Sequence, residues 1–390
     1  MVRTVSGCSI FTDHDWVKDG TLAFDRGKIV SIGPSADQAS PSDDVLRFPS
    51  DYKCIPGMID MHIHGAAGAD TMDATPEALA TIASTLPKEA TTSFLATTIT
   101  QSNEAIEAAL KNVAGAIGRQ KPGEAEIIGI HLEGPFISKD KCGAQPPEYI
   151  VDADSRKFDR WQHISNGYIK EVTLAPETAG GLDLIRHLSD RHIVASIGHS
   201  NGYYEDVVRA ITAGATQVTH LYNGMRGLHH REPGILGGAL IHHELYAELI
   251  CDGKHVCPPM VNLAYKLKGS DRIILITDAM RAKCLKNGTY DLGGQEVHVK
   301  DGMATLASGT IAGSVLKMDQ AIRNILAFTD ATLEDVVQMG AINPAHQCGV
   351  FDRKGSLETG KDADFIILDG RNRLVMTVCR GVIAYRNEGV

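Results

Sequence analysis

The sequence predicts an α/β protein, and three features of its 390 residues support this class. The middle of the chain alternates apolar runs of strand length with helix-like segments. Both ends are rich in short strands and turns. Histidine, glutamate and aspartate residues stand at the ends of several predicted strands. Together these features predict a (β/α)8, TIM-type barrel with a small β-sandwich domain formed from both termini.

The small domain is predicted from the composition of the two ends of the chain. Near the start, residues 21–24 and 28–32 flank a turn that contains Gly27, which is typical of a hairpin. Near the end, residues 364–368 and 374–378 have the composition of strands. We therefore expect residues 1–54 and 346–390 to build the small domain, and residues 55–345 to build the barrel.

The barrel is predicted from eight apolar runs, most of which precede a helix-like segment. The runs are residues 56–64, 92–98, 127–133, 170–175, 193–199, 217–222, 247–251 and 272–277. The helix-like segments include residues 76–90, 103–117, 203–213 and 258–267. Eight strand-then-helix units match a closed barrel, whose active site is expected at the carboxyl ends of the strands. A doubly wound open sheet is the structural alternative.

Residues that can bind metal fall at the ends of five of these strands. His62 and His64 end the first strand and are two residues apart, so their side chains share one face. The others are Glu133 after the third strand, His199 after the fifth, His220 after the sixth and Asp278 after the eighth. A single histidine at a strand end is more often a surface or core residue than a metal ligand, but six such residues on one rim are hard to obtain by chance. Imidazole and carboxylate ligands suit Zn²⁺, or Fe²⁺ or Mn²⁺ with more oxygen ligation.

Composition and charge argue against several classes of protein. The formal net charge of −10 disfavours a general nucleic-acid binder, although a local basic pocket for one phosphate is compatible with it. No apolar run reaches the roughly 18 residues of a membrane span. The first residues lack the apolar core of a secretion signal. The eight cysteines form no CxxC pair, so we expect reduced thiols and a cytoplasmic protein.

The order HxH, Glu, His, His and Asp on a barrel resembles the amidohydrolase superfamily. Local motifs narrow the resemblance to the N-acetylglucosamine-6-phosphate deacetylase family, from residue 56 to the C-terminus. The most specific motifs are HLEGPF at 131–136 and HREPG at 230–234; the others are PGMID at 56–60, GHS at 198–200, THLYN at 219–223, DGKH at 252–255, TDA at 277–279 and AGS at 312–314. The resemblance implies a homodimer that acts on a small amino-sugar phosphate.

The resemblance also implies roles for the strand-end residues. Glu133, His199 and His220 are the main metal ligands, while His62 and His64 hold a second ion that Glu133 bridges and Asp278 contacts. One or two divalent ions per subunit are implied, with Zn²⁺ or Fe²⁺ ahead of Mn²⁺ or Co²⁺. The implied reaction converts N-acetyl-D-glucosamine 6-phosphate to D-glucosamine 6-phosphate and acetate, in amino-sugar catabolism and cell-wall sugar recycling. Asp278 takes a proton from the attacking water and returns it to the departing amine.

Substrate-binding residues are implied by the same resemblance. They are Ala144, Gln145, Asn223, Gly224, Arg231, Asp252, Gly253, Lys254, His255, Ile311, Ala312 and Gly313. Arg231 can recognise the phosphate with two hydrogen bonds, from its own chain or from the partner subunit. Gln145 stands where some members have histidine. Its amide can donate to the acetyl oxygen but cannot titrate, so its part in catalysis is open, as is the role of Cys142.

Other functions compete with this interpretation. A dihydroorotase-like cyclic amidase needs a metal-bridging lysine at a strand end, and no predicted strand ends in one. A non-catalytic sugar-phosphate sensor would be expected to lack Asp278 or the metal ligands, but all of these residues are present. A metal-free phosphate-binding isomerase is separated by metal analysis. Related N-acetylhexosamine phosphates stay open as substrates. His131 shares the strand face of Glu133 and either supports the site from behind or belongs to the core.

Overall fold

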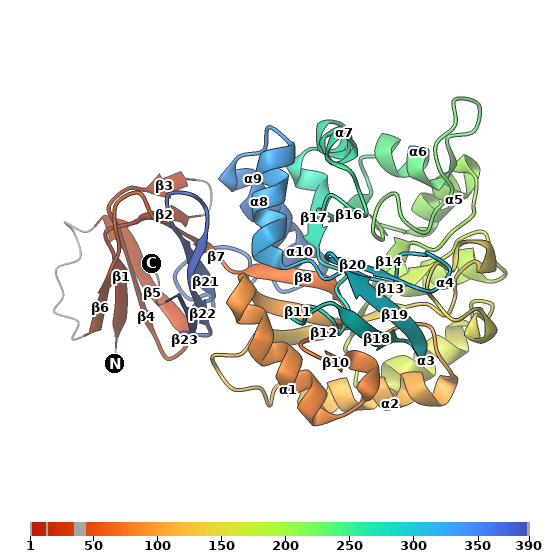
Figure 1. Cartoon of the computed structure of the whole chain (residues 1–390), viewed down its shortest axis with the longest axis horizontal. Coiled ribbons are helices and arrows are strands. Elements are labelled where there is room, and N and C mark those ends of the chain that lie inside the picture. Colours follow the sequence, from red (N-terminus) through yellow and green to blue (C-terminus); the bar gives the residue numbers. More distant parts are fainter. Residues whose placement is uncertain (1, 13–14, 35–43, 388–390) are drawn as a thin grey trace.

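The computed structural model describes residues 2–12, 15–34 and 44–387, which form a barrel and a smaller β domain (Figure 1). The first and last described strands, β1 (Arg3–Ser6) and β23 (Val382–Arg386), both lie in the β domain. The predicted fold class is confirmed. The residue boundaries of the two domains stay a prediction, and they include residues 1, 13, 14, 35–43 and 388–390, which lie outside the described residues.

The small domain consists of two sheets that share one apolar core. One sheet has the order β5 (Lys28–Pro34), β4 (Gly20–Asp25), β1 and β6 (Asp44–Arg47). The other has the order β23, β22 (Leu374–Cys379), β21 (Phe365–Leu368), β7 (Lys53–Pro56), β2 (Ser9–Thr12) and β3 (Asp15–Val17). The rings of Phe24 and Phe365 come from different sheets, and their centroids lie 5.4 Å apart. This packing joins the two ends of the chain.

Eight parallel strands form the barrel in chain order. They are β8 (Met58–Ile63), β11 (Thr91–Thr97), β12 (Glu126–Glu133), β13 (Ile169–Leu174), β14 (Val194–Ile197), β15 (Gln217–Val218), β16 (Tyr246–Ile250) and β17 (Ile273–Ile276). Each predicted run overlaps one of them, but β15 is shorter than predicted because the chain turns after Val218. The last strand returns to the first, where the Asp278 N–H donates to the His62 carbonyl at 2.8 Å. The barrel therefore closes beside the predicted site.

Helices cover the outside of the barrel (Figure 1). Their bounds are α1 (Pro76–Thr85), α2 (Asn103–Ala116), α3 (Ser155–Ile164), α4 (Gly181–Ser189), α5 (Tyr204–Ala213), α6 (Gly234–Ile241), α7 (Pro258–Lys268), α8 (Met318–Phe328), α9 (Leu333–Val337) and α10 (Asn343–Gln347). The hydroxyls of Thr75 and Ser102 accept hydrogen bonds from backbone N–H groups at the starts of α1 and α2. Such caps satisfy donors that the first helical turn leaves free, and they fix where each helix begins.

A small antiparallel sheet follows β17 and packs against loops at the carboxyl end of the barrel. It consists of β18 (Gly288–Leu292), β19 (Gln295–Lys300) and β20 (Met303–Thr305). Gln295 donates to the Ala144 carbonyl at 2.5 Å, and Gln101 donates to the Gly293 carbonyl at 2.9 Å. These bonds join the sheet to the loops after β11 and β12, so it adds a wall beside the strand ends. A further short hairpin, β9 (Gly65–Ala66) and β10 (Ala69–Asp70), follows β8.

Candidate active site

The six strand-end residues come together at the carboxyl end of the barrel. Glu133 Oε1 lies 3.1 Å from His199 Nε2 and 3.2 Å from His220 Nε2. The two Nε2 atoms are themselves 3.1 Å apart. This group comes from β12 and from the turns after β14 and β15, which shows that the barrel unites residues far apart in the sequence.

The first strand adds two histidines on the other side of Glu133. His62 Nε2 lies 3.5 Å from an oxygen of both Glu133 and Asp278. His64 Nε2 lies 3.4 Å from Glu133 Oε2 and 3.3 Å from Asp278 Oδ1. Glu133 therefore stands between two groups, one with His199 and His220, the other with His62, His64 and Asp278. All six residues are buried.

Oxygen acceptors fix the orientation of three of the four imidazoles. His62 Nδ1 lies 3.0 Å from Glu248 Oε2, His199 Nδ1 lies 2.8 Å from the Lys141 carbonyl, and His220 Nδ1 lies 3.1 Å from the Asn223 carbonyl. Because an oxygen acceptor requires the proton on Nδ1, the neutral form of each ring keeps its lone pair on Nε2, the atom that faces the centre.

This arrangement fits a divalent metal. The buried Nε2 of His62 has no hydrogen-bond partner in the described part of the chain, although it faces two carboxylates. Lone pairs and carboxylate oxygens that converge repel one another, and a positive charge between them removes that repulsion. That charge is a metal ion or, without one, the proton that His62 gains because, despite burial, the surrounding carboxylates raise its pKa. Three sets of possible ligand atoms meet within 4.8 Å: Glu133–His199–His220 and His62–His64–Asp278 at the strand ends, and His62–His131–Glu248. Nitrogen and carboxylate ligands of this kind suit Zn²⁺ and Fe²⁺.

The charges of the site control the pKa values of its carboxylates. Without a metal ion, burial raises the pKa of Glu133, but the charge of protonated His62 and the contacts with His199 and His220 outweigh it and hold this pKa well below its usual range. Burial likewise opposes ionisation of Asp278, yet the charge of His62 and the contact with His64 lower its pKa to about 2. Both carboxylates are therefore ionised at neutral pH, as metal binding and proton acceptance require.

Three of these residues have the left-handed backbone conformation that is uncommon outside glycine. The φ angles are 45° at His199, 30° at His220 and 48° at Asp278. Each of these residues follows the end of a barrel strand, where the chain leaves the sheet. Such a conformation costs roughly 1–3 kcal/mol per residue and tends to occur at functional sites. Packing at the barrel mouth thus holds the three side chains over the centre at the expense of local stability.

A cavity of about 280 Å³ lies above the cluster. This volume is just below the usual range for small-molecule sites, about 300–1,000 Å³, and suits a monosaccharide. Its lining residues are His64, Ile99, Glu133, Gly143, Ala144, Gln145, His199, His220, Asn223, Gly224, His255, Asp278, Leu292, Thr310, Ile311 and Gly313. Seven predicted substrate-binding residues are among them: Ala144, Gln145, Asn223, Gly224, His255, Ile311 and Gly313.

The remaining predicted substrate-binding residues lie outside this lining. Arg231 is exposed, and its Nη1 lies 2.7 Å from His230 Nε2. Asp252 sits behind His255 and accepts from its Nδ1 at 2.7 Å. Gly253 and Lys254 continue the same turn, and Lys254 donates to the Asp301 carbonyl. Ala312 packs into the apolar cluster below the small β18–β20 sheet. Their predicted roles in binding stay predictions.

Comparison with known proteins agrees with this geometry. The model of the amidohydrolase family matches residues 54–384. This chain belongs to the amidohydrolase family. It is 45% identical over 383 residues to N-acetylglucosamine-6-phosphate deacetylase of Bacillus subtilis (strain 168), covering 98% of this chain and 96% of that protein. It is 37% identical over 369 residues to N-acetylgalactosamine-6-phosphate deacetylase of Escherichia coli O157:H7, covering 95% and 96%.

Solved structures give the same result. A mutant of N-acetyl-D-glucosamine-6-phosphate deacetylase from Mycobacterium smegmatis, in complex with N-acetyl-D-glucosamine-6-phosphate, has a TM-score of 0.91 and 30% identity, covering 98% of this chain and 99% of that one. The enzyme from Thermotoga maritima has a TM-score of 0.88 and 34% identity, covering 98% and 100%. The family and the residue clusters support a divalent metal in the amidohydrolase site. Among the described residues, no helix combines the length and the apolar character that crossing a bilayer requires.

Gln145 is fixed beside the amidohydrolase cluster. Its Oε1 accepts from the Thr100 N–H at 2.8 Å, and its Nε2 lies 3.4 Å from His199 Nε2. Only 3% of its surface is exposed. Because the oxygen is already engaged, the amide NH₂ is the group that faces the centre and the cavity. Cys142, in the same loop, is half-buried and is not a lining residue.

The sequence analysis missed a buried acidic layer beneath the centre. Glu248 Oε2 accepts from His62 Nδ1 and from the His220 N–H at 3.1 Å, and Glu248 Oε1 accepts from Gln217 Nε2 at 3.0 Å. Gln217 also donates to Glu171 at 2.5 Å. Burial, together with the charge of Glu248, raises the pKa of Glu171 well above its usual range, so Glu171 is protonated. The sequence did contain a signal for this layer: Glu171 and Glu248 are each a single acidic residue inside an apolar strand, where a buried charge needs partners.

His131 belongs to this buried layer as well. Its Nε2 lies 2.7 Å from Thr173 Oγ1, and its ring centroid lies 4.5 Å from that of His62. Burial and the charge of His62 lower the pKa of His131 to about 3, so its imidazole is neutral. Of the two alternatives left open for His131, contact with a strand-end histidine favours support from behind the site.

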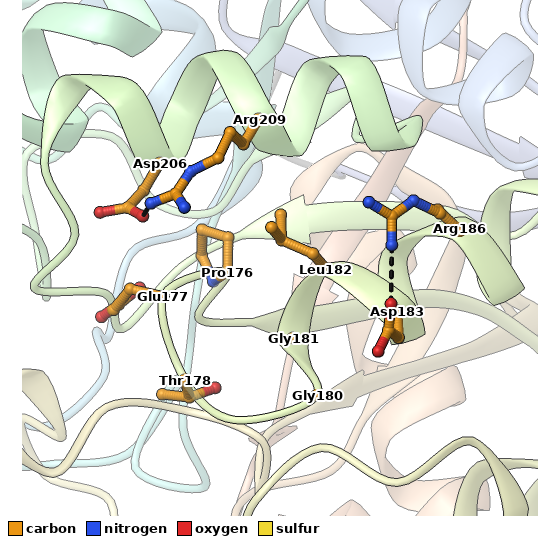
Figure 2. Close-up of a pocket in the computed structure, with 10 residues that line it drawn as sticks. All are labelled: Pro176, Glu177, Thr178, Gly180, Gly181, Leu182, Asp183, Arg186, Asp206 and Arg209. Atoms are coloured by element: carbon orange, nitrogen blue, oxygen red, sulfur yellow. Dashed lines mark hydrogen bonds and ion pairs between the residues drawn. The ribbon is translucent and has the colours of Figure 1, made fainter.

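A second hollow, of about 340 Å³, lies on the surface at the start of α4. It contains two arginines that suggest an anion site, but Figure 2 shows Arg186 paired with Asp183, at 2.7 Å, and Arg209 paired with Asp206. Both guanidinium groups are largely exposed. Both arginines of the hollow are therefore already paired with aspartates in exposed ion pairs. We assign the hollow no function.

Proposed function

We propose that this protein hydrolyses the acetamide of N-acetyl-D-glucosamine 6-phosphate to D-glucosamine 6-phosphate and acetate. One observation carries the proposal: four histidines and two ionised carboxylates meet at the floor of a cavity that has the size of a monosaccharide site. Full-length similarity to N-acetylglucosamine-6-phosphate deacetylases supports the choice of substrate.

The six residues divide between metal binding and proton transfer. Glu133, His199 and His220 would hold the main ion, and His62 and His64, together with Glu133, would hold a second. We propose Zn²⁺ or Fe²⁺, with Mn²⁺ or Co²⁺ as substitutes. A divalent ion in this position polarises the acetyl oxygen and lowers the pKa of water.

Asp278 is the proposed general base and acid. Its carboxylate lines the cavity, carries a negative charge at neutral pH and lies beside the cluster. It accepts the proton that water loses as the oxygen attacks the carbonyl carbon. It then delivers that proton to the sugar nitrogen as the C–N bond breaks, because expulsion of an amine anion is prohibitive. Gln145 presents its NH₂ to the same space and donates to the acetyl group.

The 6-phosphate is proposed to bind beside Asn223, Gly224 and His255, which line the same cavity. Burial opposes protonation of His255, but its hydrogen bond to Asp252 and the charge of that residue raise its pKa. A protonated His255 is suited to an anionic group. Arg231 is exposed and outside the lining, so we propose that it reaches the phosphate of the partner subunit in a homodimer.

The homodimer is tested by mixing two variants that are each impaired on the phosphorylated sugar. One carries Arg231→Ala, and the other carries Asp278→Asn. A hybrid dimer has one site in which Asp278 comes from one chain and Arg231 from the other, so exchange of subunits should restore part of the activity. If exchange is confirmed by labelled subunits and activity does not return, Arg231 does not act across an interface.

A related substrate is the second candidate. The 37% identity to an N-acetylgalactosamine-6-phosphate deacetylase favours some use of the galacto epimer. We propose the gluco substrate first because the B. subtilis relative is more similar, at 45%. The cytoplasm is the proposed location, where phosphorylated sugars are retained.

The experiment is acetate release from both phosphorylated sugars and from free N-acetylglucosamine, with and without a chelator. We expect the fastest release from N-acetylglucosamine 6-phosphate, and loss of that activity with chelator. Faster release from the galacto epimer would reverse the choice of substrate. No release from any acetylated sugar would contradict the proposed reaction.

A further inference from the structure

We propose that Glu248 is a positioning residue of the metal centre, which holds His62 with its Nε2 toward the ions and ties it to the backbone of His220. The inference rests on the proposed function in one respect, the presence of an ion beside His62. Glu248 lies on β16, whereas the predicted ligands come from other elements. Its hydrogen bonds therefore connect His62, at the end of β8, with His220, in the turn after β15.

The contacts of Glu248 support this role. One oxygen, Oε2, accepts from His62 Nδ1 at 3.0 Å and from the His220 N–H at 3.1 Å. The other, Oε1, accepts from Gln217 at 3.0 Å. With Nδ1 as the donor, the lone pair of His62 is left on Nε2, the buried atom that has no hydrogen-bond partner among the described residues. A carboxylate behind a metal-binding imidazole fixes both the ring and the position of its proton.

Glu248 differs from the groups that orient the other imidazoles. His199 and His220 are held by backbone carbonyls, which carry no full charge. His62 alone among the three is held by a side-chain carboxylate, with no surface exposed. A buried carboxylate is costly unless donors surround it, and here three donors do. The additional negative charge makes His62 a more basic ligand and favours a cation at the His62–His64 half of the site.

Glu248→Gln tests the charge with little change in shape. The glutamine oxygen can take the place of Oε2 and accept from His62 and His220. Its NH₂ then faces Gln217, whose own Oε1 has no partner among the described residues and can turn toward it. The matched control is Glu171→Gln. Glu171 is equally buried and contacts both Gln217 and Glu248, but no hydrogen bond or ion pair joins it to the six predicted ligands. Its glutamine can still donate to Glu248, as the protonated carboxyl does, so the contact of Glu248 with His62 is kept.

The measurement is Zn²⁺ titration of metal-free protein against a chromophoric chelator, together with the rise in melting temperature that Zn²⁺ produces. Wild type should bind two equivalents, and a His64→Ala variant identifies the equivalent at the His62–His64 half. In Glu248→Gln the affinity for that equivalent should fall by about 10–100-fold. The other equivalent and the Glu171→Gln control should be unchanged. A purely structural residue would lower the melting temperature of the metal-free protein and leave the Zn²⁺-induced rise intact.

Other outcomes overturn the inference. The first is a Zn²⁺ affinity in Glu248→Gln equal to that of wild type. The second is an equal loss of Zn²⁺ affinity in Glu171→Gln. The third is a His64→Ala variant that binds Zn²⁺ as wild type does. If Glu248→Gln does not fold, ring ¹⁵N spectra of Zn²⁺-loaded wild type decide the question, since protonated Nε2 on His62 refutes the proposal. Failure of the proposed function is distinguishable, because it removes acetate release while these titrations remain interpretable.

Discussion

Replacement of Asp278 by asparagine is the substitution that isolates proton transfer. Asparagine keeps the size of the side chain and removes the charge that accepts a proton. Asp278 contacts His62 and His64, whereas the Glu133–His199–His220 set does not include it. The fold and the main metal ligands should therefore survive the change.

The expected loss follows from the two proton transfers that Asp278 performs. General acid–base catalysis contributes about 10²–10⁴-fold, which corresponds to about 2.7–5.4 kcal/mol of transition-state stabilisation at about 1.36 kcal/mol per tenfold. We expect kcat for acetate release to fall by this factor and KM to change much less, because the phosphate contacts are untouched.

The assay is acetate release under saturating N-acetylglucosamine 6-phosphate, with melting temperature and metal content measured on the same samples. Asp183→Asn is the control, since it removes an exposed aspartate paired with Arg186 (Figure 2) and should leave kcat unchanged. A folded, metal-loaded Asp278→Asn protein within tenfold of wild type would mean that another group moves the proton.

Three further predictions concern the metal and the phosphate. Glu133→Ala should abolish tight metal binding and turnover, because Glu133 contacts both ligand groups. His64→Ala should reduce turnover less if one ion suffices for activity. Metal analysis together with acetate release distinguishes a one-ion from a two-ion centre. Asp252→Asn removes the contacts that raise the pKa of His255. The positive charge of His255 is present below that pKa and is lost as pH rises through it, so KM should begin to rise at a lower pH in the variant. An unchanged pH profile of KM would exclude His255 from phosphate binding. Arg231→Ala should lower kcat/KM for the phosphorylated sugar by about 10–100-fold, the worth of one charge-assisted bond, and leave the slow reaction with free N-acetylglucosamine unchanged.

The barrel was predictable because its strands are buried on both faces. A parallel strand of this kind is a nearly continuous apolar run, and β11 and β17 are buried at every residue. A histidine or carboxylate at the end of such a run is conspicuous, which is how His62, Glu133 and Asp278 were found.

Other parts of the site were missed because their partners are distant in the sequence. Glu248 is one acidic residue in an apolar strand, and its partner His62 lies 186 residues away. The β18–β20 sheet supplies Leu292 to the cavity wall, and it was overlooked although Gly293 and Gly294 stand where a hairpin turn was readable. Arg231 is the reverse case. A sequence motif predicted it as a substrate-binding residue, but the fold of a single chain leaves it outside the cavity.

The most direct test of the account is one set of measurements on a single preparation. Metal content and acetate release from N-acetylglucosamine 6-phosphate are determined before chelation, after chelation and after Zn²⁺ is restored. The account predicts that activity is lost with the metal and returns with it, and that neither returns in Glu133→Ala. Full activity in metal-free wild type, or stoichiometric metal and full activity in Glu133→Ala, would contradict it.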